Sequence, residues 1–283
     1  MAISSSTILR RLLVACALVT IVSAGGLPQP PPGVRAIPLA RVVRVPLVTV
    51  EAAASGGNPA GALTVSPGAA DELPEGPNGF DVLDDGRFLI TDPLGQRIAV
   101  FDPEGTFKGE WKIGFAADSV TVLPNGPVVV REANTGQLHA FNREGRPSNE
   151  PAVLPEPAEA SLLSPSRGSV TRPPRAAGGG GPLEIRLEKP GVRLLSLESL
   201  AIDGDGNTYV AIETTAGGDA SGAVNVSKAV RRYDAHGGLV AEIADIPLDY
   251  YIPPVNELRV RKGTVYQLTT TSHEVRINVW NTN

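Results

Sequence analysis

The sequence contains one cysteine, Cys16, and no dense run of lysine or arginine. A single cysteine cannot build a disulfide framework within the chain. The 283 residues include 25 Lys+Arg and 30 Asp+Glu, for a formal net charge of −5. A chain of this charge lacks the basic surface that nucleic-acid binding requires, so we expect no nucleic-acid partner.

Long apolar runs are also missing. The longest, Leu12 to Val22, is interrupted by Thr20 and falls short of the roughly 20 residues that a membrane-spanning helix needs. It follows Arg10 and Arg11 and ends at the small-residue stretch Val22-Ser23-Ala24, a pattern typical of a secretory signal peptide. We expect residues 1–24 to be removed, so that 259 of the 283 residues remain in a secreted or periplasmic protein without a transmembrane helix.

An alternative interpretation of this segment stays open. Leu13-Val14-Ala15-Cys16 has the form of a lipoprotein processing box, which would anchor the protein through a lipid on Cys16. Under the signal-peptide interpretation Cys16 is discarded and the mature chain has no thiol. Export without disulfides points to a bacterial envelope.

Glycine and proline are abundant, with 31 and 26 residues, which is too many for a helical bundle. After the signal, no helical apolar periodicity extends over ten or more residues. The composition therefore predicts short strands joined by turns.

A repeat organises these strands. Gly86, Gly126 and Gly206 are 40 and then 80 residues apart, and Phe101 and Phe141 are again 40 apart. A unit of about 40 residues with about four short strands is the signature of a propeller blade, which cannot bury both sheet faces alone. We predict an all-β, monomeric β-propeller of about six blades.

Strands are clearest in four copies, and two further blades are expected over residues 34–66 and 146–198. The predicted organisation is a signal at 1–24, a Pro-rich linker at 25–33 and one propeller domain at 34–283 with a disordered insertion at 147–182, a segment rich in Pro and Gly. The strands of the four clear copies are 80–83, 88–90 and 98–101; 120–123, 128–130 and 138–141; 200–202, 209–212 and 230–233; and 257–260, 265–268 and 275–280.

Residues 76–111 carry a recognisable motif order: Pro77-Asn78-Gly79, Asp85-Gly86, Asp92, Gln96-Arg97 and Phe101-Asp102. This order resembles an NHL repeat. The second copy keeps Gly126 and Phe141 but has Glu132 where that family prefers Asp. The resemblance implies a propeller, and because members of the family range from binding proteins to lyases, it leaves the function open.

Glu75-Gly76-Pro77-Asn78-Gly79 also resembles fragments of the gluconolactonase-like propellers, whose axial metal is held by Glu, Asn and Asp side chains from different blades. Glu198 and Glu257 precede inner strands in the third and last copies. The resemblance implies a Ca²⁺ or Mg²⁺ site that includes Glu75, Glu198 and Glu257. Glu75 and Asn78 are only three residues apart, so they cannot both take the family's ligand positions.

Two hypotheses about function follow. The first, which we favour, is a secreted binding module without cofactor or catalysis, whose axial face binds a protein, glycan or small ligand through Asn78, Asp118, Glu198 and Glu257. The second is a metal-dependent lactone hydrolase or lyase with its site at the central channel.

Overall fold

The computed structural model describes residues 33–56, 59–69, 71–124, 126–154, 159–172, 181–187, 189–216 and 225–283. The expected signal at 1–24, Cys16 and all of the Pro-rich linker except Gly33 lie outside these residues. Within the described part, no helix has the length and apolar character needed to cross a membrane.

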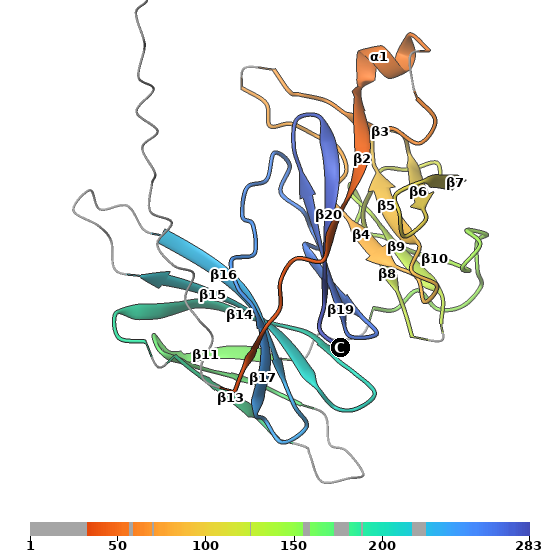
Figure 1. Cartoon of the computed structure of the whole chain (residues 1–283). Helices are drawn as coiled ribbons and strands as arrows, with labels where there is room; N and C mark the ends of the chain where they lie inside the picture. The colour runs from red at the N-terminus through yellow and green to blue at the C-terminus, as the bar shows by residue number, and fades with distance from the viewer. Residues whose placement is uncertain are drawn as a thin grey trace, which may run out of the picture.

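The described residues form five small sheets of mainly antiparallel strands (Figure 1). The first sheet consists of β4 (Phe80–Val82), β5 (Phe88–Asp92), β6 (Arg97–Phe101) and β7 (Phe107–Lys112). The second consists of β8 (Ala117–Val122), β9 (Val128–Glu132) and β10 (Leu138–Phe141). The third consists of β11 (Ala160–Ser164), β12 (Arg167–Val170) and β13 (Leu183–Arg186). All three run in chain order, as a propeller blade does.

The remaining two sheets combine strands from both ends of the chain. One contains β14 (Val192–Ile202), β15 (Thr208–Ala216), β16 (Asn225–Tyr233) and β17 (Leu239–Ile243), with β1 (Arg35–Ala36) added in parallel to β17. The other contains β18 (Leu258–Arg261), β19 (Thr264–Thr270) and β20 (Glu274–Asn281), then β2 (Arg41–Thr49) and β3 (Leu63–Val65). A short helix, α1 (Val50–Ala54), follows β2.

The 40-residue repeat is visible in the turns. Asp102 Oδ1 accepts hydrogen bonds from the backbone N–H groups of Glu104 and Thr106, and Gly105 closes the turn at φ +88°. Asn142 makes the same two contacts one repeat later, before Gly145. Glycine is needed at the closing position because this backbone conformation is unfavourable for other residues. The repeated turn chemistry explains why the repeats could be aligned.

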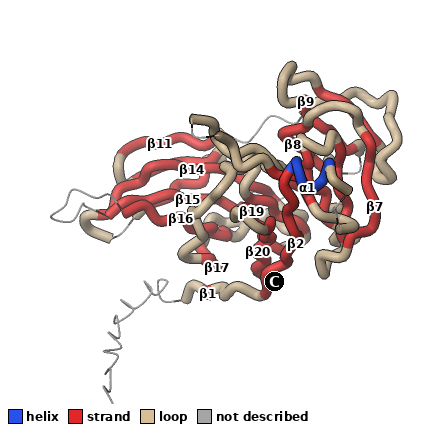
Figure 2. The backbone as a smooth tube through the Cα atoms, turned by 90° about the horizontal axis from the view of Figure 1, so that it is seen from above, coloured by secondary structure: helices blue, strands red, loops and turns tan. Residues whose placement is uncertain are grey.

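Four apolar cores join the five sheets in an open arc. In order, they lie between β11–β13 and β14–β17, between β14–β17 and β18–β20, between the β18–β20/β2 sheet and β4–β7, and between β4–β7 and β8–β10. No comparable core joins β8–β10 to β11–β13 among the described residues. Figures 1 and 2 show the result as two lobes joined through β19, β20 and β2.

The N-terminal strands complete other blades. Residues 41–46 of β2 pair antiparallel with β20, and Val43 and Val45 are buried against the β4–β7 sheet. In place of the separate blade expected over residues 34–66, the structure therefore joins the first long strand to the last one. Such pairing covers an edge of β20 that would otherwise be open to another chain.

Ordered strands also occupy the segment expected to be a disordered insertion. Within residues 147–182, β11 and β12 form a hairpin, and β12 pairs with β13. Val170, Leu183 and Ile185 are buried against the neighbouring sheet. The many prolines concealed short strands whose burial depends on contacts with β14–β16. Residues 155–158 and 173–180 of the segment lie outside the described part.

Candidate functional site

The structure places the four predicted ligand-binding residues within or just before the inner strands β4, β8, β14 and β18. Asn78 precedes β4, and its backbone oxygen accepts a hydrogen bond of 2.7 Å from the N–H of Val255. Asp118 is in β8, Glu198 is in β14, and Glu257 immediately precedes β18. Asn256 donates to Ser119 Oγ at 2.9 Å, which ties the approach to β18 to β8. Asn78, Asp118 and Glu257 therefore lie near one end of β4, β8 and β18, while Glu198 lies within β14, close enough to Glu257 and Arg259 to feel their charges.

Lys228 is the centre of a buried group of charges between the β14–β17 and β18–β20 sheets. Its ammonium forms ion pairs with Glu213, at 3.1 Å, and with Glu257. The exposed fraction of the Lys228 side chain is only 9%. Burial alone would lower the pKa of Lys228, but the hydrogen bonds and charges of Glu257 and Glu213 raise it above its ordinary value. Lys228 is therefore held as a cation between two carboxylates.

Glu257 has a full set of hydrogen-bond donors. Lys228 bonds to Oε2, while the Tyr250 hydroxyl and Gln267 Nε2 both bond to Oε1, the latter at 2.8 Å. Gln267 is fully buried and is itself fixed by Asn278, which donates to its side-chain oxygen at 3.0 Å. Burial and the bond to Glu257 raise the pKa of Tyr250. These contacts make Glu257 a fixed part of the interface.

Glu198 differs from its neighbours because its carboxylate has no hydrogen-bond or ion-pair partner among the residues that the structure describes. Its surface is open to solvent, although the surrounding protein removes part of its hydration. This desolvation raises the pKa of Glu198, and the charges of Glu257 and Glu213 act in the same direction, while Lys228 and Arg259 act against them. Glu198 is thus an available acid beside a group of paired charges.

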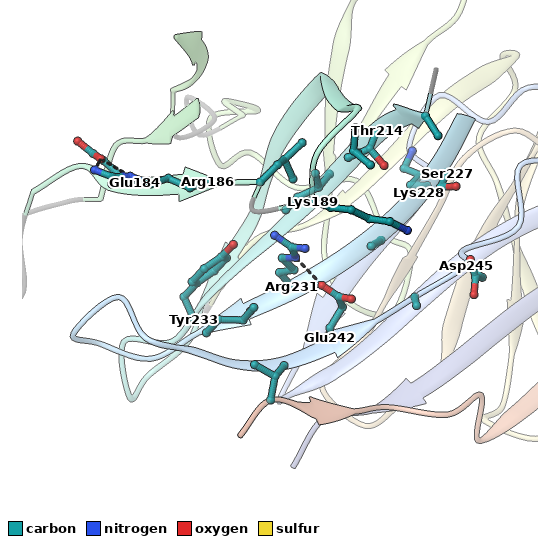
Figure 3. A pocket seen from close by; sticks show the side chains of 18 of the residues that line it. Glu184, Arg186, Lys189, Thr214, Ser227, Lys228, Arg231, Tyr233, Glu242 and Asp245 are labelled. Carbon is teal, nitrogen blue, oxygen red and sulfur yellow. Dashed lines mark hydrogen bonds and ion pairs between the residues drawn. The ribbon is translucent and has the colours of Figure 1, made fainter. Parts of the chain in front are cut away.

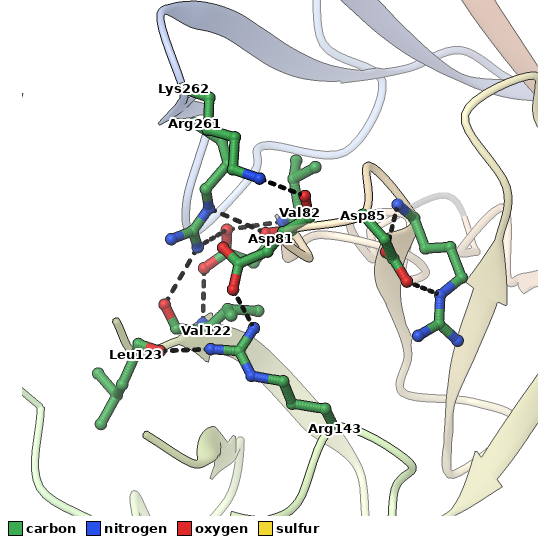
Figure 4. A network of polar contacts seen from close by, with 10 residues as sticks. Asp81, Val82, Asp85, Val122, Leu123, Arg143, Arg261 and Lys262 are labelled. Atoms are coloured by element: carbon green, nitrogen blue, oxygen red, sulfur yellow. Dashed lines mark hydrogen bonds and ion pairs between the residues drawn. The ribbon is translucent and has the colours of Figure 1, made fainter. Parts of the chain in front are cut away.

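Two arginines of β18 fill the space between the inner strands. Asp81 lies in β4 with a side chain only 4% exposed, and it accepts hydrogen bonds of 2.7 Å from the backbone N–H groups of Val82 and Val122. Arg261 contacts Asp81 at 3.4 Å and donates to the backbone oxygens of Val82 and Val122 (Figure 4). This group, which we call the arginine centre, connects β4, β8 and β18.

Arg259 is the less satisfied member of the arginine centre. Its Nε is buried without a hydrogen bond and lies 3.5 Å from Asp81 Oδ2. Burial lowers the pKa of Arg259, while the charges of Asp81 and Glu198 oppose this effect. Arg259 therefore connects the electrostatics of the arginine centre to those of Glu198.

The remaining predicted residues have mainly structural contacts. Asp118 forms a two-bond ion pair with Arg131, at 2.9 and 3.0 Å. Asn78 accepts a hydrogen bond from Thr91 at 3.4 Å. Glu75 is exposed and its backbone bridges to Ser66. Among the described residues, no group of three or more His, Cys, Asp or Glu is positioned to hold a metal ion.

The motif residues at the end of β5 also stabilise the fold. Asp92 is fully buried and accepts hydrogen bonds from Thr64, Gly95 and Arg97. Arg97 in turn donates to the backbone oxygen of Ala62 at 2.6 Å. These residues therefore attach β3 to the β4–β7 sheet.

Sequence analysis did not identify Lys228, Glu213, Arg259 or the Tyr250–Gln267 pair. One signal was available for the Glu213–Lys228 pair, because the two residues are directly opposite in the β15–β16 hairpin. A pocket of about 540 Å³ was also not anticipated. It is lined by residues of β13 and β15–β17, Lys228 among them, and by none of the four predicted ligand-binding residues.

The sheet order and the four sheet-to-sheet cores define an all-β chain of the β-propeller class. No family model matches the sequence, and no curated protein matches it.

Solved structures similar to this chain include three propeller proteins. Virginiamycin B lyase from Staphylococcus aureus is 12% identical, with 72% of this chain and 94% of that chain covered and a TM-score of 0.30. A gluconolactonase from Xanthomonas campestris is 13% identical, with coverage of 86% and 98% and a TM-score of 0.35. BamB from Moraxella catarrhalis is 10% identical, with coverage of 87% and 97% and a TM-score of 0.31. At these TM-scores the likenesses carry no argument, and the fold class rests on the sheets described above.

Proposed function

We propose that this propeller is a binding module that holds a hydroxyl-rich ligand, of the glycan class, at the end of the inner strands where Glu198 lies. The observation that carries the proposal is the difference between Glu198 and its neighbours. Glu213 and Glu257 are neutralised by Lys228, and Asp118 by Arg131, whereas the Glu198 carboxylate has no partner within the described residues.

The surroundings of Glu198 favour a neutral polar ligand over a strongly charged one. Lys228 and Arg259 are close enough to influence its pKa, but both are already engaged with other carboxylates. The half-buried amide of Asn256 is next in sequence to Glu257, and that of Asn78 belongs to a residue whose backbone bonds to Val255. A carboxylate accepts hydrogen bonds from hydroxyl groups, and amides both donate and accept, which is the chemistry that recognises a sugar.

Secretion to the cell envelope is part of the same proposal. The Arg10-Arg11 pair, the apolar run that follows and the small residues up to Ala24 support export, with attachment through Cys16 as the alternative. The NHL-like order of residues 76–111 supports a repeat of that family. An exported module of this kind would meet envelope or extracellular glycans.

A glycan array tests the proposal. Fluorescently labelled protein should bind a defined subset of glycans, and Glu198→Gln should weaken that binding by about tenfold or more, as expected for loss of a charge-assisted hydrogen bond. Glu144→Gln, which changes an exposed glutamate in the turn after β10, is the matched control and should leave binding intact. Absence of any bound glycan, or equal binding by Glu198→Gln, would contradict the proposal.

A parallel measurement addresses the metal-dependent alternative. Elemental analysis of the purified protein and a thermal melt with and without EDTA would show whether it holds Ca²⁺, Mg²⁺ or Zn²⁺. One equivalent of metal together with a lower melting temperature in EDTA would favour the hydrolase or lyase hypothesis over the binding module.

A further inference from the structure

The β14–β17 sheet carries a second concave site, and Lys228, whose ammonium pairs with Glu213 and Glu257, is among the residues that line it. The site is a pocket of about 540 Å³, enclosed by β13, the β13–β14 connection and the strands β15–β17 (Figure 3). Small-molecule sites in proteins typically occupy roughly 300–1,000 Å³. The pocket therefore has the size of a site for a small organic molecule.

The pocket exists because some of its lining side chains are small and because the β11–β13 sheet covers only part of the β15–β16 face. Leu183 and Ile185 of the β11–β13 sheet pack on Ile212 and Tyr233, which covers one part of the β15–β16 face. Further along, the lining residues include Ala216, Ala229 and Ala244, whose side chains are too short to fill the space. The pocket is thus the uncovered part of a sheet face, with a floor of small apolar groups.

The charges of the pocket fall into paired and unpaired groups. Arg231 donates to Glu242, directly opposite it in the sheet, and Arg186 pairs with Glu184 at 2.7 Å. Lys189 and Asp245 also line the pocket, and neither has an ion-pair or hydrogen-bond partner for its side chain within the described part of the chain. Lys228 also lines the pocket and is paired with Glu213 and Glu257, so among the described lining residues Lys189 and Asp245 are the unpaired cation and anion.

These two free charges come from different walls. Lys189 belongs to the β13–β14 connection and extends across the pocket in Figure 3, above Arg231 and Glu242, while Asp245 follows β17 on the far side. Asp245 has a φ of +52°, an unusual conformation for a residue other than glycine. A ligand between the two walls would meet a positive group at one end and a negative group at the other.

We propose that this pocket binds a short peptide whose free termini make it a zwitterion. Its carboxylate would pair with Lys189 and its ammonium group with Asp245. The intervening aliphatic part would lie on Ala229 and Ala244, with the hydroxyl of Ser227 on the pocket wall available to a peptide group. Charge pairing at both ends would select a zwitterion over a plain acid or amine.

Isothermal titration calorimetry with tri-alanine as the probe tests this site. Tri-alanine should bind, and either N-acetylation or C-terminal amidation of the peptide should weaken binding by about tenfold or more, because one free charge of the pocket then lacks its partner. Failure of tri-alanine to bind at millimolar concentration, or equal binding of the free and blocked peptides, would overturn the proposal.

Variants locate the binding within the pocket. Lys189→Met should remove the preference for a free carboxylate and Asp245→Asn the preference for a free ammonium group, and asparagine tolerates the backbone conformation at position 245. Ala229→Leu should abolish binding by filling the floor. Lys112→Met, at a lysine of β7 whose side chain is 86% exposed, is the matched control. If Lys189→Met and Asp245→Asn both bind tri-alanine as the wild type does, the assignment is wrong.

Tri-alanine binding to the pocket should not depend on the proposed glycan site at Glu198. Glu198→Gln changes a residue that does not line the pocket, so it should leave tri-alanine binding unchanged. Loss of tri-alanine binding in Glu198→Gln would indicate that the peptide binds at Glu198 and would refute the pocket assignment.

Discussion

The carboxylate of Asp81 accepts a hydrogen bond from the backbone N–H of Val122 at 2.7 Å, and this contact connects the inner strands of two adjacent sheets. The same carboxylate faces Arg259 and Arg261 of a third sheet. One buried aspartate therefore supports the geometry of β4, β8 and β18 together.

Replacement of this aspartate should be costly. In Asp81→Asn the two arginines lose their negative partner, and breaking a buried ion pair costs about 3–5 kcal/mol. Urea unfolding would measure the loss of free energy of unfolding. The matched control is Asp85→Asn, which breaks a surface pair with Arg87 and should cost at most about 1 kcal/mol. Equal effects of the two variants would refute the role of Asp81.

Lys228→Met should destabilise the protein by about 3–5 kcal/mol, because Glu213 and Glu257 would then face each other without a cation. Addition of Glu257→Gln to this variant should recover part of the loss, which a double-mutant cycle would measure. An additive cycle would show that the two residues do not interact.

The raised pKa of Lys228 fixes the direction of its pH dependence. Since the folded state binds this proton more tightly than the unfolded state, the stabilisation is complete below the ordinary pKa of 10.5 and is lost as pH rises through the folded value. The wild type should therefore lose more stability in strong alkali than the Lys228→Met variant. Parallel loss in both proteins would contradict this account.

Glu198 should show linkage of the same sign as Lys228, but in the acid range of pH. Its pKa is raised above the ordinary value of 4.5, so the folded state binds the proton more tightly and stability falls as pH rises through this window. Glu198→Gln should accordingly raise the melting temperature slightly near neutral pH, and the difference should vanish at acid pH below the ordinary value. A variant less stable than the wild type at neutral pH would indicate a missing partner of Glu198.

The backbone of β8 lies close to Gly79, the residue before β4. A Cβ atom at this position would lie 2.5 Å from the backbone oxygen of Asp118, which cannot move without shifting the strand. Gly79→Ala should therefore cost about 1–3 kcal/mol, the usual effect of overpacking. Gly204→Ala, where an added Cβ meets no atom within 4 Å, should have a much smaller effect in the same thermal melt. Similar losses would show that the strands are not in contact at Gly79.

Much of the fold was predictable because the same turn recurs in successive 40-residue repeats. The Gly86, Gly126 and Gly206 turns and the strands beside them are local features, set by nearby residues. The pairing of β2 with β20 joins residues more than 200 positions apart, and no local pattern specifies it. The strands β11 and β12 were missed because proline composition outweighed a weak strand pattern.

The candidate site was predictable only in part. Polar residues before or within the inner strands could be selected from the sequence, because Asn78, Asp118 and Glu198 occupy equivalent repeat positions. Their partners were not apparent, since Lys228 and Arg259 belong to strands whose contacts depend on how two sheets pack. The availability of Glu198 follows from that packing, which neutralises Glu257 and leaves Glu198 open.

Carboxyl labelling with a water-soluble carbodiimide and glycine ethyl ester, read by mass spectrometry, tests this central claim most directly. The account predicts rapid modification of Glu198 and slow modification of Glu257 and Asp81 in the folded protein. Protection of Glu198, or labelling of Glu257 at the same rate, would show that Glu198 is not the available acid at this end of the propeller.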